Sequence, residues 1–134
     1  AKVSGALDLI EKYDPRRLAR MRRDLRGFAL IGGGGEFYHH GINAYVMDLA
    51  SMRARSIPDL AATMVHEATH ARLMRAGIKP KKSNQERIER ICTEAEASFA
   101  LSYLTVWSWL NVRGPSCLRL GGVSRPCETG GSNS

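Results

Sequence analysis

The chain has 134 residues, of which 43% are hydrophobic, and its 20 basic and 13 acidic residues give a formal net charge of +7. The apolar content excludes a chain that is disordered throughout, and the length points to one domain with a core of moderate size. No apolar run approaches the roughly 18 residues of a membrane helix, so the sequence predicts no membrane span.

The first part of the chain predicts two helices followed by short strands. Residues 4–13 are typical of a short helix. Asp14 and Pro15 then match the cap and first position of a second helix, which we expect to end at Gly27. Residues 28–49 mix aromatic and β-branched residues with glycine, which predicts two or three short antiparallel strands with a glycine turn between them.

The second part of the chain predicts two longer helices. Ser56 and Asp59 have the spacing of a capping box, and Gly77 is typical of the residue that ends a helix. After a loop, Ser83 and Glu86 repeat the capping-box spacing at the start of the longest predicted helix. These signals place one helix over residues 56–76 and another from residue 83 onward.

These elements together predict a helix-rich α+β fold. We expect the short antiparallel sheet to pack on the helix of residues 56–76, with the longer helix packed behind it and ending near residue 110. The glycine- and serine-rich end of the chain is typical of irregular structure. The predicted domains are therefore a compact domain over residues 1–114 and an irregular C-terminal tail over residues 115–134.

A pair of histidines on the helix of residues 56–76 predicts a metal site. Successive residues of a helix are about 100° apart, so His66 and His70 project from one face and can bind one ion, while Glu67 can reach a water molecule on that ion. The alternative is a partly buried histidine pair with Glu67 bonded to Arg72 or Arg75. The apolar surroundings favour the metal, because polar groups in such surroundings are costly unless something satisfies them.

A catalytic zinc site needs a third protein ligand, with water in the fourth position. The next helix offers the carboxylates Glu86, Glu89, Glu94 and Glu96. We expect the loop that follows this helix to reverse the chain. Glu89, in the second turn of the returning helix, would then lie level with the two histidines. Glu96 lies on the same face two turns further on and is the main alternative ligand.

The order His66-Glu67-Ala68-Thr69-His70, then eighteen residues, then Glu89, resembles the HExxH-x18-E pattern of the gluzincin zinc metallopeptidases, in particular their small single-domain members. The resemblance covers about residues 43–103. It implies a zincin-like catalytic domain in which Zn²⁺ is held by His66, His70 and Glu89. It also implies that Glu67 acts as the base in the hydrolysis of peptide bonds, with a peptide or protein as the substrate.

The resemblance has two further implications. Gluzincins often place an aspartate four residues after the glutamate ligand to brace a histidine; this chain has Thr93 there, so the threonine hydroxyl or Glu96 would have to substitute. Gluzincins also have a strand directly before the active helix with a free edge to which a peptide adds. Residues 43–49 are the expected strand.

Several other side chains are candidates for secondary roles. An oxyanion donor could come from Tyr103, His39, His40 or Tyr45. Cys92 is expected to be a small buried hydrophobe rather than a ligand. Cys117 and Cys127 could close a loop in an oxidising compartment or stay reduced in a cytosol, and the cytoplasm is slightly favoured.

Two other functions are consistent with the sequence. A fourth protein ligand would close the metal site and make the protein a non-catalytic, metal-stabilised binding or regulatory module. Basic clusters at residues 15–26 and 79–82 would suit a nucleic-acid adaptor, although no aromatic residues are interleaved with the arginines. We expect these clusters to be a solvated surface, and the sequence leaves the oligomeric state open.

Overall fold

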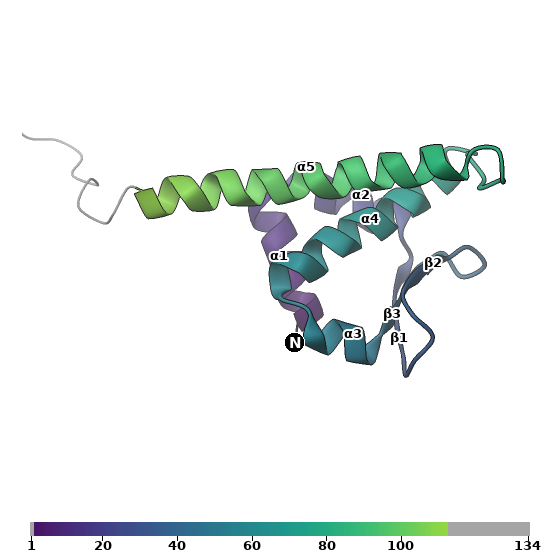
Figure 1. Cartoon of the computed structure of the whole chain (residues 1–134), viewed down its shortest axis with the longest axis horizontal. Helices are drawn as coiled ribbons and strands as arrows, with labels where there is room; N and C mark the ends of the chain where they lie inside the picture. The colour runs from purple at the N-terminus through teal and green to yellow at the C-terminus, as the bar shows by residue number, and fades with distance from the viewer. Residues whose placement is uncertain (1, 113–134) are drawn as a thin grey trace, which may run out of the picture.

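The computed structural model describes residues 2–112, with side chains up to residue 105, and its elements are arranged as in Figure 1. In chain order they are α1 (Lys2–Tyr13), α2 (Pro15–Asp24), β1 (Gly27–Ile31), β2 (Phe37–His39), β3 (Ala44–Asp48), α3 (Leu49–Ala54), α4 (Ile57–Arg75) and α5 (Gln85–Val112). The helix-rich α+β class predicted from the sequence is confirmed. The predicted tail, with Cys117 and Cys127, lies outside the described residues. Among the described helices, none is both long and apolar enough to cross a membrane.

Helix α2 begins as predicted but ends earlier. The Asp14 side chain accepts a hydrogen bond from the backbone N–H of Arg17 at 3.0 Å, and Pro15 is in the first turn. The helix ends at Asp24 because Leu25 adopts extended dihedral angles. The predicted end at Gly27 was therefore wrong: Gly27 already belongs to β1, where pairing with β3 replaces the helical hydrogen bonds.

The sheet is mixed, so the predicted antiparallel sheet was wrong in one of its two pairings. Its order is β1-β3-β2, with β1 parallel to β3 and β2 antiparallel to β3. All five residues of β3 are buried, which suits the central position, whereas β1 and β2 alternate between more and less exposed residues. Strand β3 therefore has no free edge. The edge of the sheet that lies beside α4 belongs to β2.

The connections around the sheet depend on glycine and on one carboxylate. Gly33, Gly34 and Gly35 have φ values of +90°, +106° and +83°, which side chains rarely tolerate. One Asp48 oxygen accepts from the Gly33 N–H at 2.6 Å, and the other accepts from the Ser51 N–H at 3.0 Å. Asp48 thereby fixes the glycine turn and caps α3, a helix that separates β3 from α4 and that the sequence did not predict.

Helices α4 and α5 agree closely with the prediction. The Ser56 side chain accepts from the Asp59 N–H at 3.3 Å, and Gly77, with φ +83°, follows the end of α4. Helix α5 begins at Gln85 rather than Ser83, because Asn84 bonds the loop through Lys79 and Lys81. In Figure 1, α5 lies across α4 and its C-terminal half extends beyond the rest of the fold.

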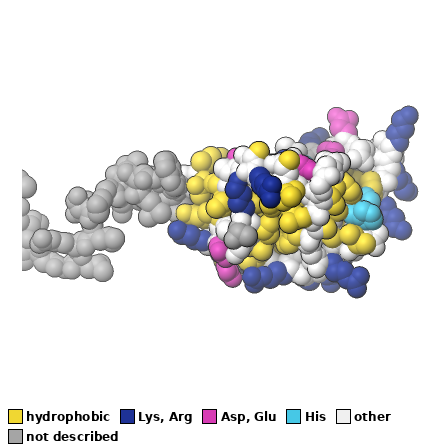
Figure 2. Space-filling view, turned by 90° about the horizontal axis from the view of Figure 1, so that it is seen from below, with side chains coloured by type: hydrophobic (Ala, Val, Ile, Leu, Met, Phe, Trp, Pro, Cys, Tyr) yellow, Lys and Arg dark blue, Asp and Glu magenta, His cyan; other side chains and the backbone are white. Residues whose placement is uncertain are grey.

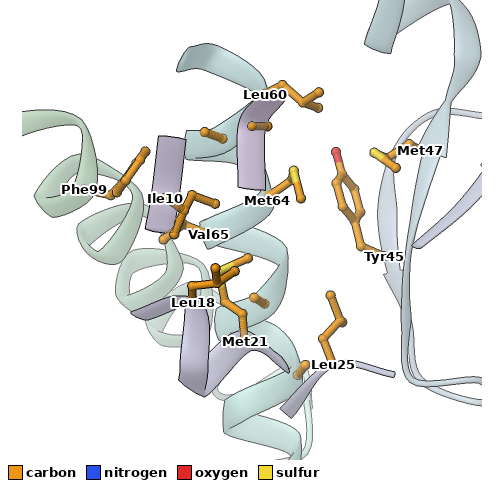
Figure 3. Packing of buried hydrophobic residues seen from close by; sticks show 14 of the residues in the cluster. Ile10, Leu18, Met21, Leu25, Tyr45, Met47, Leu60, Met64, Val65 and Phe99 are labelled. Carbon is orange, nitrogen blue, oxygen red and sulfur yellow. The ribbon is translucent and has the colours of Figure 1, made fainter. Parts of the chain in front are cut away.

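The core forms where α1, α2 and β3 meet α4 (Figure 3). Phe99 adds one buried ring from α5. The other large members of the cluster are Ile10, Leu18, Met21, Leu25, Tyr38, Tyr45, Met47, Leu60, Met64 and Val65. Helix α4 is thus fixed along its length by apolar contacts, and this fixes the direction in which its polar side chains point.

Candidate metal centre and active site

Two imidazoles lie on one side of α4, on successive turns. The ring centroids of His66 and His70 are 5.2 Å apart, and the side chains are only 18% and 16% exposed. Burial lowers the pKa of His70 below its ordinary value, which favours the neutral ring. A neutral imidazole is the form that binds a metal ion.

Glu89 of α5 faces both rings. Its Oε2 atom is 3.5 Å from His66 Nε2 and 3.6 Å from His70 Nε2. Zinc bonds of about 2.1 Å in a tetrahedron put neighbouring ligand atoms about 3.4 Å apart. The two distances from Glu89 to the histidines therefore match those between ligands around one ion. This is where the sequence analysis placed Glu89, level with the histidines.

Two more side chains of α5 orient these groups. Gln85 donates a hydrogen bond from Nε2 to Glu89 Oε1 at 2.8 Å, which leaves Oε2 directed at the histidines. Glu96 Oε2 is 3.0 Å from His66 Nδ1. Because a carboxylate only accepts, Nδ1 is the donor of this hydrogen bond, and Nε2 is the nitrogen that faces Glu89. Glu96 thus lies where a bracing carboxylate lies beside a metal-bound histidine, whereas Thr93 is exposed.

Glu67 is a buried carboxyl group beside these ligands. The residue is 9% exposed, and its carboxyl group accepts a hydrogen bond from the backbone N–H of Tyr38. Arg75, one suggested partner, contacts Asp24 at 3.4 Å instead. Burial raises the pKa of Glu67 to about 7 in the metal-free protein. A carboxyl group of this kind can exchange protons near neutral pH.

The candidate ligands and Glu67 line one open cavity of about 330 Å³. Strand β2 forms another wall of it through Phe37 and Tyr38, and Pro80 of the α4–α5 loop lies at its rim. The Tyr38 ring is parallel to the His70 ring, with centroids 6.5 Å apart, and its hydroxyl donates to Asn43 at 2.7 Å. The cavity thus joins the histidine face of α4 to the free edge of the sheet.

Sequence reasoning missed a second buried carboxylate at the site. Glu36 contacts Arg55 through Oε2 and Nη2 at 2.7 Å, while its Oε1 atom has no partner among the described residues. Arg55 also bonds the Thr63 hydroxyl of α4. Together with Glu67, these side chains line an adjoining cavity of about 410 Å³. The only sequence signal was a lone charge after the glycine run, which also fits a surface turn.

The structure separates the candidates for an oxyanion donor. Tyr103 packs edge-on against Tyr13 of α1, with centroids 5.3 Å apart, and does not line the cavity. Tyr45 is fully buried, with a hydroxyl that has no partner among the described residues, and its pKa is raised by burial. His39 Nδ1 accepts from the Gly41 N–H at 3.2 Å. Of the four candidates, His40 alone lines the cavity among residues 2–105.

Cys92 lies closer to the histidines than the sequence suggested. It is fully buried, and its Sγ atom and one ring nitrogen each of His66 and His70 all lie within 4.8 Å of one another. Burial raises the pKa of the Cys92 thiol to about 12, so the side chain is protonated in the metal-free protein.

The basic clusters are partly neutralised within the fold. Arg17 bonds Asp14 at 2.8 Å and Arg23 bonds Asp24 at 2.7 Å. Figure 2 shows a histidine surface near one end of the molecule, with lysine and arginine side chains around its border.

No protein-family model, curated protein or solved structure matches the chain.

Proposed function

We propose that the protein is a zinc-dependent metallopeptidase. The observation that carries the proposal is the position of Glu89 Oε2, which is 3.5 and 3.6 Å from the Nε2 atoms of His66 and His70. These atoms come from two helices, α4 and α5, that pack against each other. Two imidazoles and one carboxylate are a ligand set of catalytic zinc sites, which keep one position open for water or substrate.

The chain's own residues support hydrolysis in defined ways. Zinc held by His66, His70 and Glu89 would supply Lewis-acid chemistry, making a water nucleophilic near pH 7 and polarising the scissile carbonyl. Glu67 accepts the proton of the attacking water and delivers it to the leaving amine. Glu96 holds His66 in the tautomer that binds through Nε2. We assign to His40, which lines the cavity, the hydrogen bond to the developing oxyanion.

The proposed substrate is an extended peptide that pairs with the edge of β2. The predicted docking strand, β3, lies in the middle of the sheet and has no free edge. Strand β2 has one, and its residues Phe37 and Tyr38 line the cavity that contains Glu67. A peptide added there would gain main-chain hydrogen bonds and would run past the candidate ligands.

One observation favours the alternative function, a non-catalytic metal-stabilised binding or regulatory module. The Cys92 sulfur is near enough to the histidines to complete a four-ligand site. Four protein ligands leave no position for water, and such sites are structural.

Metal content and hydrolysis test the proposal together. We expect about one zinc per chain in the wild type, loss of zinc in Glu89→Ala, and full zinc in Glu67→Gln. Removal of the general base lowers the rate by about 10²- to 10⁴-fold, measured on a mixture of quenched fluorogenic peptides. Glu86→Gln, which changes an exposed carboxylate on the same helix as Glu89, is the matched control. A zinc-loaded wild type that hydrolyses none of the peptides would favour the alternative function. A wild type that binds no zinc would overturn both the peptidase and the metal-stabilised module.

A further inference from the structure

One nucleophilic side chain near the candidate ligands has no part in the proposed mechanism. Cys92 lies three residues after Glu89 and four before Glu96, so the three side chains share one face of α5. That face lies against α4, where the Cys92 sulfur and one nitrogen of each histidine are all within 4.8 Å of one another.

Cys92 is buried beside ionisable groups. The residue is fully buried, yet it is not a member of the hydrophobic cluster that joins α4 to α1, α2 and β3. Its sulfur lies near both imidazoles, and the charges of Glu89 and Glu67 act on it. Glu67 lines the same cavity as the histidines. Several metal-binding or ionisable groups thus converge where α4 meets α5.

We propose that Cys92 is a fourth protein ligand of the ion in a closed, resting state of the site. The proposal deepens the proposed function and rests on it. A metal–sulfur bond forms, the S–H bond breaks, and the proton passes to solvent; the sulfur binds as a thiolate. Zinc bonds of 2.1 Å to nitrogen and 2.3 Å to sulfur give nitrogen–sulfur separations of about 3.6 Å. Because the sulfur lies within 4.8 Å of one nitrogen of each ring, each of these separations has to shorten by about 1.2 Å at most.

Two consequences follow for the chemistry of the site. With His66, His70, Glu89 and Cys92 all bound, the ion has no open position, so water or substrate enters only when the sulfur leaves. The thiolate also makes the site favour thiophilic ions, such as Cd²⁺, over hard ions, such as Mn²⁺. The cysteine would then govern both which ion is held and how often the site is open.

Cobalt substitution gives a direct test, because a thiolate bound to Co²⁺ produces a charge-transfer absorption in the near ultraviolet. The full-length chain carrying Cys117→Ser and Cys127→Ser is loaded with Co²⁺, so that Cys92 is its only thiol. We expect the charge-transfer band in this protein and no band after the further change Cys92→Ala, with Co²⁺ still bound by the other ligands. Cd²⁺ affinity should fall about tenfold more than Mn²⁺ affinity in Cys92→Ala.

The outcomes separate this proposal from the proposed function. Bound Co²⁺ without a charge-transfer band in the Cys117→Ser, Cys127→Ser protein overturns ligation by Cys92 and leaves the three-ligand site standing. A charge-transfer band that is present in the wild type but is lost when only Cys117 and Cys127 are replaced also overturns it. If no Co²⁺ binds, both proposals fail. If Cys92→Ala does not fold, the band in the Cys92-only protein still decides the question, and Cys92→Ser provides a second variant.

Discussion

Two sets of buried residues on α4 differ in what they do for the fold. The apolar set, with Leu60, Val65 and Ala68, packs into the core. The polar set, His66 and Glu67, is almost as well buried but is ionisable. The apolar set stabilises the fold. Burying the polar set costs free energy when no ligand is bound, and such a cost is typical of a functional site.

The largest expected effect on folding comes from the apolar set. Leu60→Ala removes a fully buried side chain from the core and should lower the free energy of unfolding by about 2–5 kcal/mol, measured by urea denaturation. Leu101→Ala is the control, because Leu101 is 64% exposed and its loss should cost less than about 0.5 kcal/mol. Equal losses in the two variants would show that α4 is not the centre of the core.

In the polar set, Glu67 should lower the free energy of unfolding of the metal-free protein when it is ionised. A pKa of about 7 for Glu67 in the fold, against 4.5 in the unfolded chain, means that ionisation opposes folding. This group's stabilising contribution is complete below pH 4.5 and is lost as the pH rises through 7, at about 1.4 kcal/mol per pH unit.

Glu67→Gln should therefore stabilise the chelator-treated protein, and more so at high pH. Between pH 5 and pH 8 its advantage over the wild type should grow by about 2–3 kcal/mol, as urea denaturation at the two pH values would show. Glu86→Gln, an exposed carboxylate, should give no such pH dependence. An advantage for Glu67→Gln that stays constant with pH would mean that Glu67 is not desolvated.

A smaller effect, on zinc affinity, is expected where α5 contacts His66 of α4. Glu96→Gln removes the charge that holds His66 Nδ1 at 3.0 Å and should weaken zinc binding by about 10- to 100-fold, measured by chelator competition. Glu94→Gln is the matched control on the same helix, and it is exposed. Complete loss of zinc from Glu96→Gln, with zinc retained in Glu89→Ala, would mean that Glu96 is the metal ligand and that Glu89 is not.

The comparison also shows which parts of the molecule were predictable. The caps at Asp14 and Ser56 are local, since each side chain bonds a backbone group within three residues. The position of Glu89 level with the two histidines followed from where one helix ends, a short loop and where the next helix begins, and these signals are also local. The centre of the sheet was not predictable, because parallel pairing of β1 with β3 depends on contacts between segments far apart in the chain.

The sequence by itself determined most of the helices, the caps at Asp14 and Ser56 and the order of two histidines and two glutamates, because helical periodicity and capping act over one or two turns. Only the tertiary structure decided that Glu96 contacts His66 through Nδ1, that Cys92 lies beside both rings and that Glu36 enters the site. These relations depend on how α5 and β2 dock on α4, and docking is fixed by the shape of the whole core rather than by any local pattern.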